Sequence, residues 1–247
     1  MISSAFHTLL YQPLYNSLVF LTSIIPGADI GLAVITLTIV VRFVLLPLSH
    51  KQRSTQAKMK LLEGEMAAIK KTYESDKRVQ GEKIMALYKE HGVNPLSGFL
   101  LILIQIPILL ALYFVFTRGI PFGSTDLYSF VSLPTNIDSS FFGLLELSVA
   151  NIWIAVVVGV SQYFQTVLAL PPMPAVDKNK PQDLGSAFAK SMNTNMRYVM
   201  PVVIILISAK LPAVVSLYWL TSNLFGIAHE LIVRHKAKEI AGPLKAS

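Results

Sequence analysis

Five long apolar runs constrain this chain more than any other feature. They cover residues 30–48, 96–117, 147–170, 198–211 and 213–233. A helix needs roughly 20 apolar residues to cross a hydrocarbon core about 30 Å thick. Only 14% of the 247 residues are charged, whereas a water-soluble domain carries more charge. The runs therefore predict an all-α polytopic membrane protein with five transmembrane helices.

The fourth and fifth runs are separated only by Pro212 and its neighbours. Because proline interrupts helices, we expect these two runs to form a tight helical hairpin. One merged helix is the alternative, but it would far exceed the thickness of one bilayer.

Lys and Arg residues alternate along the connections between the runs. Residues 50–94 and 171–197 and the tail after Val233 are rich in them, whereas residues 118–146 contain only Arg118 and the short fourth connection only Lys210. Cytoplasmic connections carry the excess of basic residues. The pattern predicts a multi-pass protein with its N-terminus outside and its C-terminus in the cytoplasm, and topology explains the net charge of +7 without nucleic-acid binding.

The predicted segments follow from the runs and from this orientation. Residues 6–25 are closed off by Pro26 and Gly27 and interrupted by Pro13, so an interfacial helix is expected there, and a sixth span is the alternative. The segments in order are an outer-face interfacial helix at 1–28, a first span at 29–49, a cytoplasmic helical hairpin at 50–94, a second span at 95–117, an outer loop at 118–146, a third span at 147–170, a cytoplasmic loop at 171–197, a fourth span at 198–211, a fifth span at 212–233 and a basic cytoplasmic tail at 234–247.

The segment at 50–94 differs from the spans because its apolar residues are spaced rather than continuous. They recur at alternating steps of three and four, at Met59, Leu62, Met66, Ile69 and Tyr73. That spacing places an apolar seam on one face of a helix. Residues 79–88 predict a second helix, and residues 75–77 predict the turn between them. We therefore expect an antiparallel hairpin in the cytoplasm.

Arg42 is the most informative single residue, because a guanidinium group within an apolar run is costly and tends to face a wet cavity. It lies seven residues before Ser49, so its Cα is roughly 10 Å from the cytoplasmic end of the first span. The alternative is snorkelling, in which the long side chain carries its charge to the headgroups.

Strongly polar residues occur in other predicted spans as well. They are Gln105, Gln162, Gln165, Thr221, Ser222 and Asn223, and Trp219 accompanies the last three. Ordinary hydrogen bonding between helices is the commoner use of such residues. A water-filled groove would satisfy them together with Arg42.

The sequence gives no sign of enzymatic chemistry. It contains no cysteine, and the acidic residue nearest a span interior is Glu230, beside His229. Phosphate-binding loops, zinc-protease motifs and nucleophile elbows are not found. We therefore expect no enzyme activity, no metal site and no cofactor.

Three stretches carry a family resemblance. They are residues 41–48 (VRFVLLPL), residues 94–98 (NPLSG) leading to 105–108 (QIPI), and residues 211–213 (LPA) leading to 218–225 (YWLTSNLF). With these stretches the chain resembles the YidC/Oxa-type membrane protein insertases of bacterial cell membranes. Fewer than thirty residues precede the first span, so we expect a short form without a large outer domain.

The resemblance implies a five-helix core with a hydrophilic groove that opens to the cytoplasm and to lipid. Arg42 would capture substrate, and the groove would be lined by Gln105, Gln162, Gln165, Trp219 and Asn223, with Gln165 preferred to Gln162. The implied partners are nascent membrane proteins and the lipid bilayer, with the Sec translocase and the ribosome as candidates, the latter through the hairpin and the short tail. The rival hypotheses are a small-anion transporter or channel that uses Arg42 and a structural assembly factor that uses the hairpin.

Overall fold

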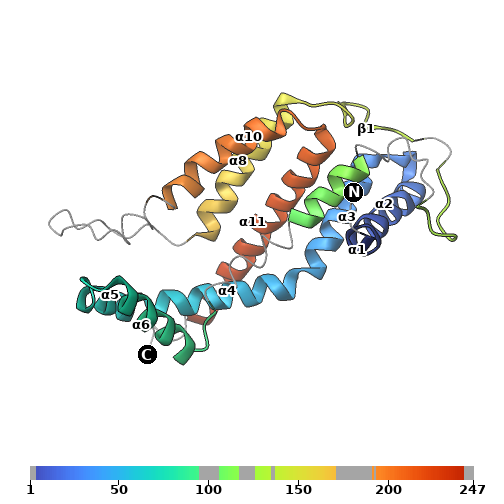
Figure 1. Cartoon of the computed structure of the whole chain (residues 1–247). Helices are drawn as coiled ribbons and strands as arrows, with labels where there is room; N and C mark the ends of the chain where they lie inside the picture. The colour runs from blue at the N-terminus through green and yellow to red at the C-terminus, as the bar shows by residue number, and fades with distance from the viewer. Residues whose placement is uncertain are drawn as a thin grey trace. The chain divides into compact units, whose positions relative to one another are not determined.

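The structure is a computed structural model that describes residues 4–94, 106–116, 126–134, 137–170, 191 and 193–241. The chain forms two compact units, one made of residues 1–42 with 111–247 and the other of residues 43–110. The described part is mostly helical (Figure 1), which confirms the all-α class. Its one sheet is a two-stranded ribbon.

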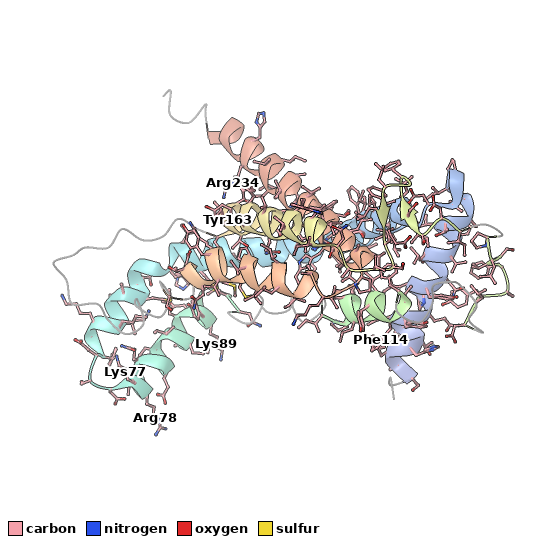
Figure 2. The ribbon with its side chains drawn as sticks, turned by 90° about the horizontal axis from the view of Figure 1, so that it is seen from above. Lys77, Arg78, Lys89, Phe114, Tyr163 and Arg234 are labelled. Atoms are coloured by element: carbon pink, nitrogen blue, oxygen red, sulfur yellow. The ribbon has the colours of Figure 1, made fainter. Side chains whose placement is uncertain are left out.

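The first unit begins with a continuous helical stretch made of α1 (Ser4–Phe6), a π-helical turn (His7–Tyr11) and α2 (Gln12–Ile24). Buried Asn16 fixes this stretch to the chain at 126–128. Its Nδ2 donates to the Asp126 carbonyl at 2.8 Å, and its Oδ1 accepts from the Tyr128 N–H at 2.7 Å. The Phe6 ring also meets Phe114 edge-on at 6.4 Å, from the helix Ile106–Phe116 (Figure 2). Whether this stretch is interfacial or inserted stays a prediction.

The helix α3 (Ile30–Val44) begins at an Asp29 cap that also holds the ribbon. One Asp29 oxygen accepts from the Leu32 N–H at 3.0 Å, and the other accepts from the Phe142 N–H at 2.9 Å. The ribbon pairs β1 (Ser140–Phe141) with β2 (Leu145–Glu146) in antiparallel register. The Asp29 carboxylate therefore joins the start of α3 to the ribbon residue Phe142, which lies 113 residues later in the sequence.

The predicted first span, 29–49, contains a helix break. The helix α3 ends at Val44, and α4 (Leu46–Leu61) starts after a turn at Leu45. Pro47 explains the break, because it lacks an N–H and its ring would clash with a carbonyl one turn earlier, whereas the first turn of a new helix accepts it. Hydropathy alone does not reveal this break, since the residues on both sides are apolar.

The helices α8 (Ile152–Ala169) and α11 (Ala213–Ala241) start together at one end of the first unit (Figure 1). Two backbone bonds join their beginnings: Ala213 N–H donates to the Val149 carbonyl at 2.8 Å, and Val214 N–H donates to the Leu147 carbonyl at 3.1 Å. Asn151 caps α8, since its Oδ1 accepts from the Trp153 N–H at 2.9 Å. The two helices therefore run in the same direction.

The helix α10 (Met200–Ser208) follows a π-helical turn (Asn195–Val199) and packs against α8. The approach is close at Gly159, where a Cβ atom would overlap the Ile205 side chain. The helix α10 ends at Ser208, and α11 begins at Ala213. The fourth and fifth apolar runs are therefore separate helices, not one merged helix.

The outward face of α8 is apolar while its inward face is small and partly polar. Trp153, Val156, Val157, Val160 and Phe164 are exposed, whereas the buried side holds Ala155, Val158, Gly159 and Ser161. In the described residues, α8 is the one helix both long and apolar enough to cross a membrane, and Ile30–Val44, Ile106–Phe116 and Asn195–Ser208 are apolar but shorter. The five predicted spans therefore stay a prediction.

The second unit contains α4, α5 (Glu63–Thr72) and α6 (Lys77–Glu90). Its core consists of buried Leu62, Leu87, Tyr88 and Val93, against which Met59, Met66, Ile69 and Ile84 pack. Burial raises the pKa of the Tyr88 phenol, and its hydroxyl donates to the Met66 Sδ at 2.8 Å. Four of the five predicted seam residues thus meet in one cluster.

The turn between α5 and α6 is closed by side chains at both helix ends. Asp76 caps α6, accepting from the N–H groups of Arg78 and Val79 at 3.1 Å. Gln80 Nε2 donates to the Lys70 carbonyl in the last turn of α5 at 2.9 Å. Lys77 and Arg78 point outward at this end (Figure 2).

The first helix of the predicted hairpin is interrupted at Leu62, between α4 and α5, and Tyr73 lies beyond the end of α5.

Replacing Asp29 should loosen the join between α3 and the ribbon. We expect Asp29→Ala to lower stability by about 1–2 kcal/mol, because two N–H groups lose their acceptor. The measurement is the apparent melting temperature of the purified protein in detergent. Asp138→Ala is the matched control, since that exposed carboxylate bonds only Ser140 nearby. Equal melting temperatures for the two variants would contradict this role of Asp29.

Candidate functional site

A polar contact lies inside the seam between α8 and α11. The Asn223 side chain is 2% exposed, and its Nδ2 donates to the Ser161 Oγ at 2.9 Å and approaches the Val158 carbonyl at 3.5 Å. The Ser161 hydroxyl in turn donates to the Val158 carbonyl at 2.7 Å. The structure thus places Asn223 within the helix–helix contact, where it joins α8 and α11.

One turn further along the same seam, Gln165 lies against Gly226. A Cβ atom on Gly226 would come within 2.6 Å of the Gln165 Nε2. The absence of a side chain at Gly226 therefore leaves room for the Gln165 amide beside α11. Gln165 is partly exposed, so its amide is both positioned by the seam and accessible.

The two helices are joined again near the end of α8. Arg234 of α11 donates to the Leu168 carbonyl, one of the last carbonyls of α8. Its Nε also donates to the Glu230 Oε1 at 2.9 Å. A basic side chain is favourable at a helix C-terminus because it satisfies carbonyls that lack a partner within the helix. Glu230 thus holds Arg234 in an ion pair.

Arg42 lies in the last turn of α3, near Tyr218 of α11. Its side chain is partly exposed. Within the residues described by the structure, no carboxylate forms an ion pair with it. Without a counter-ion among the described residues, this guanidinium presents a positive potential to whatever approaches it.

Buried hydroxyls add polar character near α10 and α11. Ser208, Ser216 and Ser222 are almost fully buried, and their Oγ atoms have no hydrogen-bond partner in the described ranges. Ser222 lies one turn after Tyr218. By contrast, the Thr221 hydroxyl donates to the Leu217 carbonyl of its own helix at 2.8 Å. The buried surface of α11 is therefore unusually rich in polar groups for an apolar unit.

The remaining predicted site residues that the structure describes form no hydrogen bond between α8 and α11. Gln162 Nε2 donates to the Thr166 Oγ1 at 3.2 Å within α8. Trp219 of α11 is partly exposed. Gln105 lies outside the described residues. The structure thus brings Arg42, Gln165 and Asn223 against α11 or within it, while Gln162 bonds along its own helix.

Sequence reasoning missed Ser161 and Tyr218. Ser161 lies four residues before Gln165, and this spacing places both side chains on one helix face. Tyr218 precedes Ser222 by the same spacing. These signals were present, but a serine or tyrosine is too common in apolar helices to stand out alone.

In the described part of the chain, no group of three or more His, Cys, Asp or Glu side chains is arranged so that it could hold a metal ion.

The arrangement combines an arginine that has no ion-pair partner among the described residues with a polar seam and an apolar outer face of α8. A family model described as 60Kd inner membrane protein matches residues 20–240. The chain belongs to the YidC/Oxa-type insertase family. This confirms the family resemblance carried by its sequence.

Members of this family from distant bacteria align with most of the chain. A Fusobacterium nucleatum protein named membrane protein insertase YidC is 34% identical over 209 residues, which are 84% of this chain and 87% of the relative. A Francisella tularensis subsp. novicida protein of the same name is 32% identical over 208 residues, 83% of this chain but 32% of that relative. The chain thus spans about a third of the Francisella protein and most of the Fusobacterium one. Such relatives imply an inner membrane protein.

The contact between Asn223 and Ser161 should be measurable as a coupling energy. We expect a double-mutant cycle with Asn223→Ala and Ser161→Ala to give about 0.6 kcal/mol, up to about 1.7 kcal/mol, the range found for hydrogen bonds between membrane helices. Reversible SDS unfolding would measure it.

The control cycle combines Ser161→Ala with Thr221→Ala, because Thr221 bonds only along its own helix. Its coupling should be near zero. A coupling for Asn223 no larger than that of the control would show that the hydrogen bond does not join the helices.

Proposed function

We propose that this protein is a membrane protein insertase that captures polar tails or short loops of substrate proteins in a hydrophilic intramembrane groove open to the cytoplasm. The observation that carries the proposal is Arg42 beside Tyr218, with no ion-pair partner in the described ranges, in a unit whose outside is apolar. The relatives named as insertases support it. Insertases are not enzymes, and the proposal requires no catalytic residue or cofactor.

The physical task of an insertase is to move a polar segment through lipid. Every unsatisfied backbone group costs several kcal/mol in hydrocarbon. A wet groove that reaches part of the way through the bilayer would shorten the apolar distance that a tail has to cross. The polar groups of α8 and α11, among them Gln165 and Ser222, would supply hydrogen bonds along that groove.

Arg42 would attract acidic residues in the substrate tail. Two opposite charges 4 Å apart attract by about 1 kcal/mol in bulk water, but by about 4 kcal/mol at an effective dielectric constant of about 20. A partly buried guanidinium therefore selects acidic tails more strongly than an exposed lysine on α6. We propose Arg42 as the capture residue and Gln105, Gln162, Gln165, Trp219 and Asn223 as its polar surroundings.

Release would follow the apolar outer faces of the unit. Exposed Val156, Val160 and Phe164 on α8 offer a surface along which the apolar segment of a substrate can pass into lipid. Transfer of apolar area out of water drives this step, so no nucleotide is required. The proposed topology has five spans, an outer N-terminus and a cytoplasmic C-terminus. In it the α5–α6 hairpin faces the cytoplasm, where the Sec translocase and the ribosome are candidate partners.

The charge at position 42 should decide insertion of substrates with acidic tails. We expect Arg42→Lys to retain most activity, and Arg42→Ala and Arg42→Glu to reduce insertion by about tenfold or more, since each 1.4 kcal/mol of lost attraction is a factor of ten. The measurement is protection of the tail of a single-span substrate from external protease in liposomes that contain only this protein.

The matched control is Arg78→Glu, which makes the same charge change on the exposed surface of α6. It should insert substrate like the unaltered protein. Full insertion by the Arg42→Glu variant would remove Arg42 from the mechanism. Arg42-dependent flux of a small anion without insertion would favour the transporter hypothesis instead.

A further inference from the structure

The tip of the β1–β2 ribbon is apolar and exposed. Phe142 is 64% exposed and Leu144 is 91% exposed, and Gly143 lies between them. The ring of the preceding Phe141 fills the space where Gly31 of α3 lacks a side chain, and the Phe142 ring lies against it, with 4.6 Å between the ring centroids. The ribbon therefore has one aromatic ring packed on the protein and an apolar pair that is exposed.

The tip is held in place at the start of α3. Ile30 N–H donates to the Asp138 carbonyl at 3.2 Å, and Asp138 N–H donates to the Ala28 carbonyl at 3.3 Å. The Phe142 N–H is bound to the Asp29 carboxylate. These bonds fix the tip at the level where an apolar helix ends, which in a membrane protein is the level of the lipid headgroups.

Phenylalanine is an unusual residue for the backbone conformation at the tip. Phe142 and Gly143 both have positive φ angles, of 52° and 68°. Glycine accepts such a conformation at no cost, but an aromatic residue there is uncommon. Turns normally carry Asn, Asp or Gly at such positions. Burial within the first unit does not compensate for a phenylalanine here, because the ring is exposed.

The ribbon leads along the chain to α8, whose first residues are apolar and exposed. The Leu147 N–H donates to the Ser139 carbonyl at 3.0 Å, so the ribbon leads directly into the start of α8. There Trp153 is 77% exposed beside exposed Ile152. Tryptophan is enriched at the boundary between lipid and water. Hydrogen bonds from Ser140 and Ser148 lower the pKa values of Asp138 and Glu146 respectively, so the ribbon base stays charged and hydrated.

We propose that the Phe142–Leu144 tip inserts into the bilayer at the boundary between headgroups and acyl chains, as an anchor that sets the depth of α3 and α8. The occupant of this surface is lipid, because the exposed Phe142 and Leu144 precede a helix whose start exposes Ile152 and Trp153, while the charged Asp138 and Glu146 stay at the ribbon base. In the proposed topology the leaflet is the outer one. The membrane contact itself does not depend on that orientation or on the insertase mechanism.

Site-directed spin labelling can test this, because the chain contains no cysteine. Single Phe142→Cys, Leu144→Cys and Ser148→Cys variants would be labelled and reconstituted in zwitterionic lipid vesicles at low protein content. We expect labels at 142 and 144 to collide more with oxygen than with a water-soluble nickel chelate. The label at 148, on the exposed ribbon base, should show the reverse. The tip positions are outside the core, so these variants should fold.

Two outcomes would overturn the proposal. If the nickel chelate reached positions 142 and 144 as readily as position 148, the tip would lie in water. If both reagents were excluded from the tip, it would be covered by protein. A second readout is Leu144→Asp in the Phe142→Cys background, which should shift the label at 142 toward the nickel chelate. An unchanged label would also contradict lipid insertion.

Discussion

The parallel contact between α8 and α11 is the interaction on which the first unit depends. Backbone bonds at 147–149 and 213–214 join the two helices at their beginnings, the Asn223–Ser161 bond joins them in the middle, and Arg234 joins them at the end of α8. In lipid, polar side chains tie helices together because water is not there to solvate them. The same contact brings Gln165 beside Gly226. A single helix pair therefore supplies both the frame of the unit and part of its candidate site.

The distribution of apolar and polar side chains on α8 suits a helix that is surrounded by lipid. The exposed side of α8 carries large apolar residues, whereas its buried side carries Gly159 and Ser161. Small residues allow close helix contact, as Gly159 does with α10. Arg42 is the exception, because it lies next to Tyr218 without an ion-pair partner in the described residues. In the proposed insertase, an unpaired charge inside an apolar shell is a site for acidic substrate segments.

The sequence predicted the helical class from its apolar runs and the family from short motifs. It also predicted four of the five seam residues along α4 and α5, because apolar periodicity records which faces are buried. It did not predict the break at Leu45, since hydropathy ignores the geometry imposed by Pro47. The ribbon at 140–146 was also missed, because it is held by an Asp29 contact over a long sequence separation. For the site, the sequence named Asn223 as a groove-lining residue, which stays a prediction, but it did not reveal the hydrogen bond between Asn223 and Ser161. Only the fold reveals which neighbour a polar side chain meets.

In the proposed insertase, water reaches the polar site from the cytoplasm alone. Single cysteines at positions 42 and 165 should react with a membrane-impermeant thiol reagent added from the cytoplasmic side. Cysteines at Leu32 and Ile35 are matched controls, because these side chains are also partly exposed in the structure but lie in the outer part of the first predicted span. They should react poorly from either side. Equal labelling of positions 42 and 165 from the outer side would instead indicate a pore through the whole bilayer and would contradict the insertase account.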